Sequence, residues 1–547
     1  MTRQCKRISY LFVFLMVFSG LLIPLGQSCK DIVVSSAATA GDYSLLLKVR
    51  DPSRDGLQVL CRVPKGTTYS YHHPWTGKPW EFLVTHTFIG VATQGDTLPN
   101  IVKAGMVLTD AGLAFGDADT RSGWVNPTKN AWDDFDWIRY ACQSVQNEEE
   151  AITALTTEAV DQLHATGVSE NLFVIGPQKA VVIEADALRY TRKNISTVAV
   201  MSNYAKDLWR TQFIKSLPVA SSFDLQKETG VRRGVILRLG SFCGVRIIQI
   251  TPSALTVKLF PSFVFTQSGL ETEYSIPLGE RVTVGPYSMR LLEINETTAK
   301  ISLCTAAFAW EQKIHSIIDP VIGNITIQHM MDWSRLHPED LDNLRPLCED
   351  QVTYEAVMIW KIPTEQANFL SSGWFAANHA CSSIYVPVHI CDEEFYEAYE
   401  TGEAANLSLS LLQKYGHGNI TALCQSVETV FLAENQGNEL LAYEMIQHSM
   451  NITPFMTAVD MAMQEQAFLT QQLWFSAPNT TRNLIEHLWM ENYSVSLFHM
   501  QQAMLPLSQI PGSSGMLVTL TKIIQSIRQS QVKREAFQVG LPSIGDE

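Results

Sequence analysis

A long apolar leader followed at once by a cysteine is the feature that most constrains this 547-residue chain. The leader starts with the basic stretch TRQCKR, continues through ISYLFVFLMVFSGLLIPL, and ends in small residues at Gly26 and Ser28. This order is typical of a secretory signal peptide that is cut before Cys29. We therefore expect residues 1–28 to leave the chain and folding to begin at Cys29. Because the apolar run is long for a signal peptide, an uncleaved membrane anchor is the alternative.

The composition favours a large, acidic, multidomain protein. Hydrophobic residues make up 46% of the chain and charged residues 17%, and the length is enough for about two to four domains. The net charge is −15, and loss of Arg3, Lys6 and Arg7 with the leader would bring it to about −18. Nucleic acids and anionic membranes need clustered cations, so neither is expected as a partner.

Glycosylation sequons agree with export. An Asn-x-Ser/Thr pattern is an acceptor only in a chain that enters a secretory pathway. The sequons lie at Asn194, Asn295, Asn324, Asn406, Asn419, Asn451, Asn479 and Asn492. We expect a secreted or otherwise extracytoplasmic protein.

The cysteines predict disulfides rather than a metal centre. Cys5 would leave with the leader and Cys29 would become the first residue. The others are Cys61, Cys142, Cys243, Cys304, Cys348, Cys381, Cys391 and Cys424. An even number in an exported chain indicates disulfides, whose pairing the sequence leaves open. No Cys or His spacing is typical of zinc, so we expect neither a metal nor a cofactor, and lone histidines such as His86 and His379 are expected to be structural.

Residues 29–233 are expected to form the first part of the main domain. Short β-branched runs predict strands in DIVVSS, SLLLKV and FLVTHTFIGVAT, and a hairpin in GMVLTDAGLAFGD. Helical periodicity covers residues 132–166, and strands follow in NLFVIG, AVVIEA and TVAVMSN. This order of strands, helices and strands predicts a layered α+β fold.

Three further regions follow along the chain. Residues 234–305 alternate apolar and polar positions, which predicts a small inserted β module, with a disulfide between Cys243 and Cys304 at its stem. Residues 306–400 return to a mixed pattern and are expected to supply late strands of the main domain. Residues 401–547 are helical in periodicity, although no strong pattern remains after Lys533.

Cys29 is the residue whose position suggests chemistry. If the leader is cut before it, one residue carries both a thiol and an α-amine with a pKa near 8. Such an amine can take the proton of the thiol and later return it to a leaving amine. A nearby cation favours the thiolate, and Lys48 and Arg50 are candidates. The alternatives for Cys29 are a lipid-modified cysteine, which Leu25-Gly26-Gln27-Ser28 fits poorly, and a disulfide partner.

Four blocks of sequence resemble the N-terminal nucleophile (Ntn) cysteine hydrolases. They are CKDIVVSSAATAGDYSLLLKVRDP, GMVLTDAGLAFGD, EEAITAL through SENLFVIGPQKAVVIEA, and VAVMSNYAKD, in the order in which the superfamily has them. A weaker fifth block is WFAANHACSSIYVPVHI. The superfamily includes dipeptidase A and secernin, penicillin V acylase, choloylglycine hydrolase, and acyl-coenzyme A:6-aminopenicillanic acid acyltransferase. The resemblance implies a four-layer αββα sandwich.

The resemblance also assigns roles to single residues. Cys29 matches the nucleophile, Asp51 the acid that holds the α-amino group, and Asn203 the asparagine of the oxyanion hole. Asn171 matches a Glu-Asn pair whose role is as often structural as catalytic.

Some positions depart from the superfamily pattern. Its arginine aligns with Lys48, while Arg50 falls at a variable position, so which cation serves the thiol stays open. Asp117 or Asp119 stands where choloylglycine-type enzymes keep a second polar residue of the substrate site. Arg233, or its neighbour Arg232, is the loose match to a downstream arginine.

Together these features predict an exported Ntn-type cysteine amidohydrolase with no cofactor. It would cleave linear amides, either dipeptides or N-acyl amino acids, through a thioester on Cys29. An acyltransferase would use the same site, and a lipid-anchored envelope protein without catalysis is the alternative from another class. The oligomeric state is left open.

Overall fold

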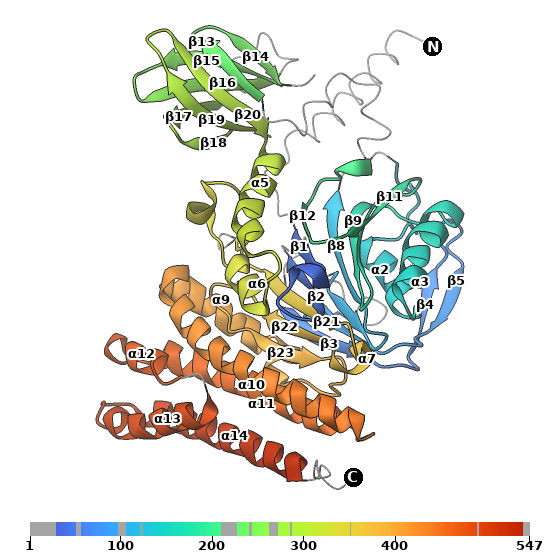
Figure 1. Cartoon of the computed structure of the whole chain (residues 1–547), viewed down its shortest axis with the longest axis vertical. Coiled ribbons are helices and arrows are strands. Elements are labelled where there is room, and N and C mark those ends of the chain that lie inside the picture. Colours follow the sequence, from blue (N-terminus) through green and yellow to red (C-terminus); the bar gives the residue numbers. More distant parts are fainter. Residues whose placement is uncertain are drawn as a thin grey trace.

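The computed structural model describes residues 29–50, 56–96, 105–120, 122, 124–208, 227–239, 243–261, 272–284, 287–349, 352–489 and 492–539 (Figure 1). Helices and strands both make up large parts of these ranges, which confirms the mixed α and β class expected from the sequence. Within the same ranges, none of the helices combines the length and hydropathy that a membrane span requires. Asp51, assigned to the α-amino group, lies outside the described residues.

A six-stranded antiparallel sheet contains the start of the described chain. Its order is β12-β1-β2-β21-β22-β23. The strands are β1 (Lys30–Val34), β2 (Tyr43–Arg50), β12 (Val198–Ser202), β21 (Ala356–Pro363), β22 (Ser372–Ala376) and β23 (Val386–His389). The predicted strands DIVVSS, SLLLKV and TVAVMSN are therefore all in this sheet. All five residues of β1 are buried, because elements cover both faces of the strand.

A seven-stranded antiparallel sheet has the order β11-β10-β9-β8-β7-β6-β3. Its strands are β3 (Gln58–Val63), β6 (Phe88–Thr93), β7 (Val107–Thr109), β8 (Ala114–Thr120), β9 (Ser169–Ile175), β10 (Ala180–Ala185) and β11 (Tyr190–Ile195). The predicted hairpin is confirmed as β7 and β8, whose turn includes Gly112 at a φ of 74°. A separate hairpin, β4 (Thr68–His72) and β5 (Pro79–Leu83), lies beside this sheet.

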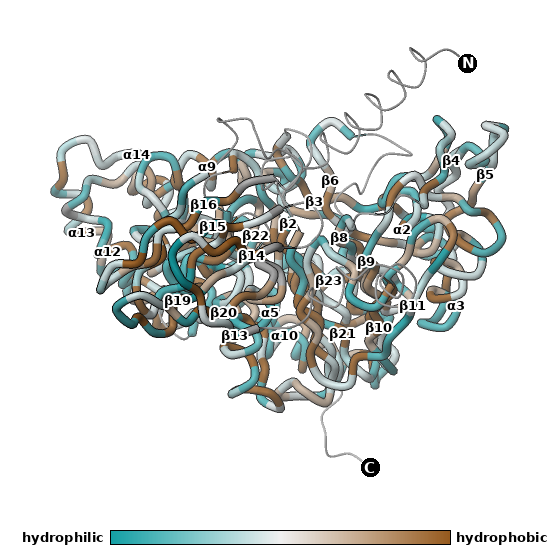
Figure 2. Tube along the Cα trace, turned by 90° about the horizontal axis from the view of Figure 1, so that it is seen from above, coloured by the Kyte–Doolittle hydropathy of each residue, from teal (hydrophilic) through white to brown (hydrophobic). Residues whose placement is uncertain are grey.

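The two large sheets pack face to face. Strands β1, β2 and β12 of the first contact β8 of the second, and β2 also contacts β9. Ile32 and Leu46 from one sheet share a core with Phe173 and Ile175 from the other. Apolar side chains on the facing surfaces thus hold the sheets together. Figure 2 shows hydrophobic stretches along many strands of the interior.

Helices cover the outer faces of both sheets. On the seven-stranded sheet lie α2 (Asp134–Cys142), α3 (Glu148–Thr153) and a π-helical segment, Ala154–Gln162. The side chain of Asp133 accepts the backbone N–H of Asp136 and so caps α2. On the six-stranded sheet lie α6 (Ile327–Ser334), α7 (Ala367–Leu370), α10 (Thr421–Gln447) and α11 (Thr453–Ser476).

Residues 227–305 form two four-stranded antiparallel sheets that lie at the far end of the molecule from the C-terminal helices (Figure 1). One sheet contains β13 (Lys227–Arg232), β18 (Arg281–Val284), β19 (Tyr287–Ile294) and β20 (Thr298–Thr305). The other contains β14 (Ile236–Leu239), β15 (Cys243–Ile250), β16 (Ala254–Pro261) and β17 (Thr272–Pro277). They share a small core of their own, and α5 (Ala306–Ile318) leads from β20 back to the large sheets.

The C-terminal part is helical, as its periodicity predicted. The remaining helices are α8 (Glu397–Thr401), α9 (Glu403–Tyr415), α12 (Asn479–Glu486), α13 (Tyr493–Ser508) and α14 (Ser514–Val539). Helix α14 packs along α11 and α13 and continues past Lys533, where no pattern was found. The ring of Phe537 lies 5.1 Å from that of Phe455 in α11, and this contact orders the end of α14.

The expected disulfide between Cys243 and Cys304 is wrong, because Cys304 is a free thiol. Strands β15 and β20, which carry the two cysteines, belong to different sheets of the small β region. The guanidinium of Arg281 lies 3.5 Å from the Cys304 sulfur instead. All eight cysteines whose side chains the structure describes are free.

Candidate active site

Cys29 lies immediately before β1, between β2 and β12. Lys30 pairs with Ser202 on one side and with Val49 on the other. Continuing this antiparallel register by one residue places Cys29 opposite Asn203 and Arg50. Opposed residues of antiparallel strands share one face of the sheet, so these three side chains belong to the same face. The sheet therefore brings together residues that are about 20 and 170 positions apart in the sequence.

Lys48 of β2 links the two large sheets near Cys29. Its side chain is fully buried, and its Nζ lies 2.6 Å from Oδ1 of Asp117 on β8. The same ammonium group also donates to the backbone carbonyl of Asp117 and lies 3.9 Å from Oδ1 of Asp31. Burial opposes the charge on Lys48, but the two carboxylates outweigh it and raise the pKa of Lys48 well above its ordinary value. Lys48 is therefore a fixed cation.

The charges of these groups act on the Cys29 thiol. Burial raises the pKa of Cys29 to about 12, Lys48 lowers it, and Asp117, Asp31 and Asp119 raise it further. In this chain, where Cys29 still follows a peptide bond, the thiol is thus protonated at neutral pH. A protonated thiol is a poor nucleophile, so a further positive charge is needed at this position.

Carboxyl groups are concentrated around the thiol. Asp31 is fully buried, and neither of its carboxylate oxygens has a hydrogen-bond partner among the described residues. Burial is the largest cause that raises the pKa values of Asp31, Asp134 and Glu170 well above their ordinary range. Neighbouring carboxylates add to this effect, whereas Lys48 opposes it at Asp31. Asp117 and Asp119 are among those neighbours. This group of five carboxyls would accommodate a cationic ligand.

Asn203 follows β12 and reaches the strand that carries the acids. Its Nδ2 donates to the backbone carbonyl of Asp119 at 2.7 Å, and its Oδ1 is buried without a partner among the described residues. Asn171 has a different role. Its Nδ2 donates to the carbonyls of Ser202 and Tyr204, both at 2.9 Å, so Asn171 fastens the backbone on either side of Asn203. Both N–H groups of Asn171 are used in the structure, which favours the structural reading of that residue.

Arg50 is held by other groups. Its guanidinium donates to Oε1 of Gln58 and lies 5.5 Å from the ring centroid of Phe135. Lys48 is the strongest of the charges that shift the pKa of the Cys29 thiol. Lys48 is therefore the better candidate for the cation that serves the thiol.

Arg233 does not join this group. It is exposed in the turn between β13 and β14, in the small β region that lies away from β1 and β8 (Figure 1). The resemblance matched Arg233 to a substrate-site arginine by its order in the sequence. Order in the sequence does not determine where the loops of an inserted region lie in space.

The sequence alone did not assign three acids to the site, namely Asp31, Asp134 and Glu170. Asp31 had a signal, because a residue two positions after Cys29 in a strand lies on the same face. Asp134 begins α2 and Glu170 lies in β9, and nothing local in the sequence links either of them to Cys29.

No protein-family model and no curated protein matches the chain. Among 31 matching solved chains, one is penicillin V acylase from Agrobacterium tumefaciens, at 12% identity and a TM-score of 0.25. Another is a mutant conjugated bile acid hydrolase from Clostridium perfringens, at 10% identity and a TM-score of 0.30. Both are Ntn hydrolases, the superfamily that the sequence resembles.

These similarities are low, and their coverage differs. The acylase match covers 35% of this chain and 60% of the acylase, and the bile acid hydrolase match covers 67% of this chain and 90% of the hydrolase. The chain thus spans less than two thirds of the length of the acylase. The roles of single residues rest on the geometry around Cys29.

Proposed function

We propose that this protein is an exported Ntn-type cysteine amidohydrolase with an αββα core, and that Cys29 is its nucleophile. The observation that carries the proposal is the position of Cys29. It stands at the start of a central strand, coupled to Lys48 and in register with Asn203. A thiol, a fixed cation and an amide donor at one end of a β-sandwich are the groups that thioester chemistry needs.

Removal of the leader would complete this site. Cleavage between Ser28 and Cys29 creates an α-ammonium group directly on the residue whose thiol is now held protonated. The new positive charge lies close to Asp31, whose buried carboxyl has no hydrogen-bond partner among the described residues. We expect the ammonium group to lower the pKa of the Cys29 thiol, so that the unprocessed chain is inactive and cleavage activates it.

The reaction then proceeds in two halves. The neutral α-amine takes the thiol proton, and Sγ attacks the carbonyl carbon of the amide, while an N–H of Asn203 stabilises the oxyanion. The C–N bond breaks, the leaving amine receives the proton, and a thioester remains on Cys29. Water attacks the thioester, the carboxylic acid leaves, and the thiol regains a proton.

The acids around Cys29 favour a substrate that carries an amino group. Asp117 and Asp119 lie on β8 beside the thiol, and together with Asp31 they outnumber Lys48 among the largest charges that act on Cys29. An ammonium group on the substrate would be attracted to this surplus of carboxylates, and a substrate carboxylate would be repelled. We therefore propose peptides with a free N-terminus, such as dipeptides, rather than N-acyl amino acids.

Export is supported by the surface positions of the sequons. Each of the eight acceptor asparagines is exposed. Other asparagines of this chain are buried, for example Asn126, Asn171 and Asn378. If the sequons had arisen without regard to glycosylation, some of their asparagines would be expected to be buried as well. We propose that the mature protein is a secreted glycoprotein, and removal of N-glycans by an amidase should lower its apparent mass on a gel.

The decisive experiment determines the N-terminus of the secreted protein and measures the activity of a Cys29→Ser variant. Intact-mass and N-terminal analysis should find a free Cys29, and Cys29→Ser should abolish hydrolysis of dipeptides. Cys304→Ser is the matched control, because Cys304 is a buried free thiol in the separate small β region. A diacylated or internal Cys29, or full activity in Cys29→Ser, would overturn the proposal.

A further inference from the structure

A second group of chemically reactive side chains lies on the other side of the six-stranded sheet. One ring nitrogen of His337 and the sulfurs of Cys348 and Cys381 all lie within 4.8 Å of one another. Cys348 and Cys381 are free thiols, and all three residues are buried. They come from three separate segments, so their spacing in the sequence carries no motif.

His337 points to a missing ligand. The residue is 5% exposed, yet neither of its ring nitrogens has a hydrogen-bond partner among the described residues. A buried imidazole without hydrogen-bond partners is costly, because it has lost its hydration. The ring of His337 stacks on that of His417, with centroids 3.9 Å apart, but this contact does not satisfy the ring nitrogens. A group that accepts a lone pair from a ring nitrogen would remove that cost.

Two further groups converge on the same place. Oε2 of Glu355 lies 3.6 Å from the Cys348 sulfur and 3.7 Å from Nδ1 of His379. The Nε2 of His379 lies 3.0 Å from the backbone carbonyl of Val352, so its N–H faces that carbonyl, and Nδ1 has no hydrogen-bond partner among the described residues. A carboxylate oxygen and an imidazole lone pair that face each other repel unless a cation or a proton lies between them.

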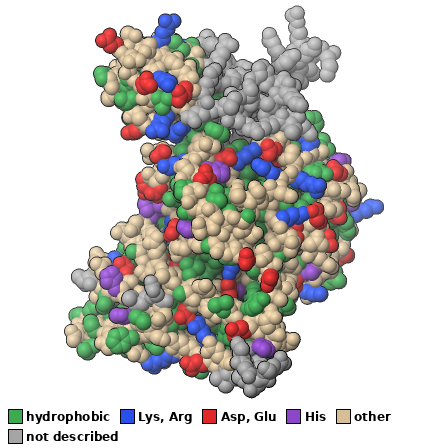
Figure 3. All heavy atoms as spheres, in the orientation of Figure 1, with side chains coloured by type: hydrophobic (Ala, Val, Ile, Leu, Met, Phe, Trp, Pro, Cys, Tyr) green, Lys and Arg blue, Asp and Glu red, His purple; other side chains and the backbone are tan. Residues whose placement is uncertain are grey.

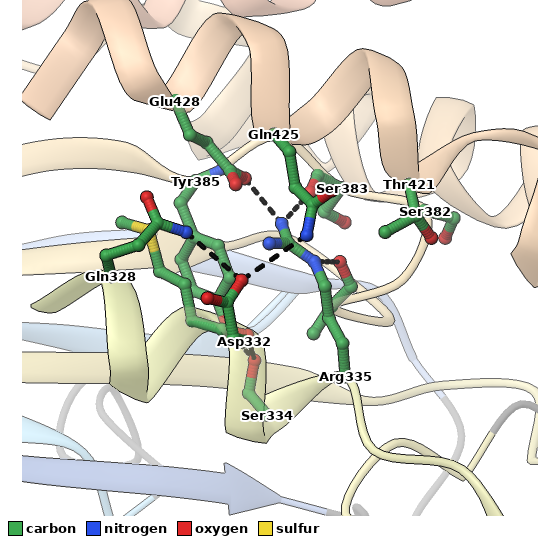
Figure 4. Close-up of polar contacts among 12 residues, drawn as sticks. Gln328, Asp332, Ser334, Arg335, Ser382, Ser383, Tyr385, Thr421, Gln425 and Glu428 are labelled. Atoms are coloured by element: carbon green, nitrogen blue, oxygen red, sulfur yellow. Dashed lines mark hydrogen bonds and ion pairs between the residues drawn. The ribbon is translucent and has the colours of Figure 1, made fainter. Parts of the chain in front are cut away.

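The segments that carry these residues are held firmly (Figure 4). Arg335, two residues before His337, donates to the carbonyl of Ala380 at 2.9 Å and pairs with Glu428 of α10 at 2.5 Å. Glu428 also accepts the backbone N–H of Tyr385. These bonds join the end of α6, the segment around Cys381, and α10. The backbone N–H of Cys348 donates to the carbonyl of Leu336, next to His337, at 3.2 Å, so the three candidate ligands have little freedom to move apart.

We propose that His337, Cys348 and Cys381 bind one zinc ion, and that Glu355, which lies outside the 4.8 Å group but 3.6 Å from the Cys348 sulfur, moves in as the fourth ligand. Two thiolates, an imidazole and a carboxylate are a donor set that zinc accepts in tetrahedral sites. Ligand atoms of such a site lie about 3.5–3.8 Å apart, so the sulfurs and nitrogen would draw together by up to about 1 Å. The thiols of Cys348 and Cys381 would lose their protons on binding.

The zinc site would support the strand that carries the candidate nucleophile. Lys30, next to Cys29, points to this face of the sheet, and its Nζ lies 2.7 Å from Glu349, the neighbour of Cys348. An ion would fix the Cys348 segment and, through Glu349, the first residues of β1. The inference itself does not depend on the proposed amidase activity.

Metal content of the full secreted chain tests the proposal. Elemental analysis after dialysis against buffer with trace zinc should find about one zinc per chain. His337→Gln and the double variant Cys348→Ser/Cys381→Ser should each lose it. Cys424→Ser is the control, because Cys424 is a fully buried free thiol outside the group, and it should retain zinc. The His337→Gln substitution removes the stacking on His417 but no side-chain hydrogen bond between described residues, so this variant is expected to fold.

A spectroscopic measurement covers the case in which the cysteine variants fail to fold. Cobalt bound to the wild-type chain in place of zinc should give a thiolate-to-metal charge-transfer band that zinc then removes. Zinc-free protein in which Cys348 and Cys381 are joined by a disulfide, seen as two hydrogen masses lost and as a linked peptide, would overturn the proposal. Zinc that persists in His337→Gln and in the double variant would overturn it as well.

Discussion

Lys48 is the cation that most strongly affects the Cys29 thiol among the residues that the structure describes. It is completely buried between Asp117 and Asp31, so its charge is neither screened by water nor free to move. A lysine supplies charge without the planar fork of arginine, and here its compact ammonium group fits between two carboxylates of facing sheets. The sequence left open whether Lys48 or Arg50 serves the thiol, and the geometry favours Lys48.

A Lys48→Met substitution tests this role. It keeps the length of the side chain but removes the charge, so the thiol should ionise at higher pH and kcat/KM for a dipeptide should fall roughly 10- to 100-fold at neutral pH. The buried carboxylates would lose their partner, which costs about 3–5 kcal/mol of unfolding free energy. A pH–rate profile separates the two effects, and Lys48→Arg, which keeps the charge, should restore the profile in part. An unchanged pH profile in Lys48→Met would contradict the role.

The β7–β8 hairpin determines the position of Asp117 and hence of Lys48. Gly105, just before β7, has a φ of 57°, and a Cβ at this position would overlap the carboxylate of Asp117. Only glycine lets the backbone pass so close to that side chain. The backbone at Gly105 therefore constrains the side chain of Asp117 on β8.

Gly105→Ala should displace Asp117 from Lys48. We expect a loss of about 2–4 kcal/mol in unfolding free energy, from left-handed backbone strain and overlap together, and a fall in kcat/KM. Gly66→Ala is the matched control, because Gly66 has a φ of 91° but open space around the added Cβ. The control should show the backbone strain alone, with activity retained. Equal losses in the two variants, measured by denaturant unfolding and by activity, would refute the clash with Asp117.

Over the whole molecule, buried charges join the helical C-terminal part to the six-stranded sheet. His389 of β23 lies 2.6 Å from Asp460 of α11 and 3.5 Å from Glu439 of α10. Burial alone would lower the pKa of His389, but the two acids outweigh it and raise the pKa to about 10. Burial alone would raise the pKa of Glu439, but Lys361 and His389 lower it to about 2. On the face of the molecule drawn in Figure 3, Lys and Arg side chains are interspersed with Asp and Glu side chains.

These two pKa shifts predict a pH range of highest stability. The contribution of His389 is complete below its ordinary pKa of 6.5 and is lost as the pH rises through about 10. The contribution of Glu439 is complete above its ordinary pKa of 4.5 and is lost as the pH falls through about 2. Both are present between these ordinary values, so the combined contribution of these two groups to Tm should be largest near pH 4.5–6.5.

A His389→Gln variant measures the histidine contribution. Its Tm should be lower than that of the wild type at pH 6 and should change less between pH 6.5 and 10, because the group that titrates there is gone. His487→Gln, which alters an exposed histidine, should keep the wild-type profile. Parallel profiles for His389→Gln and the wild type would exclude this origin of the pH dependence.

Local patterns in the sequence were enough to predict elements. Short β-branched runs gave β1, β2, β9, β10 and β12, the Asp-x-Gly turn gave the β7–β8 hairpin, and helical periodicity gave α10, α11 and most of α14. The leader and Cys29 suggested a nucleophile, because a side chain and an α-amine on one residue need no tertiary contact to meet. These inferences depend on neighbouring residues, whose relation the covalent chain fixes.

Only the tertiary structure decided which distant residues meet. Strand register brings Asn203 opposite Cys29, and sheet packing puts Asp117 against Lys48 and gathers Asp134 and Glu170 near them. His337, Cys348 and Cys381 likewise meet only through packing, and the free Cys304 shows that cysteine order does not fix pairing. The physical reason is that contacts across sheets follow from the packing of whole faces, which no local spacing encodes.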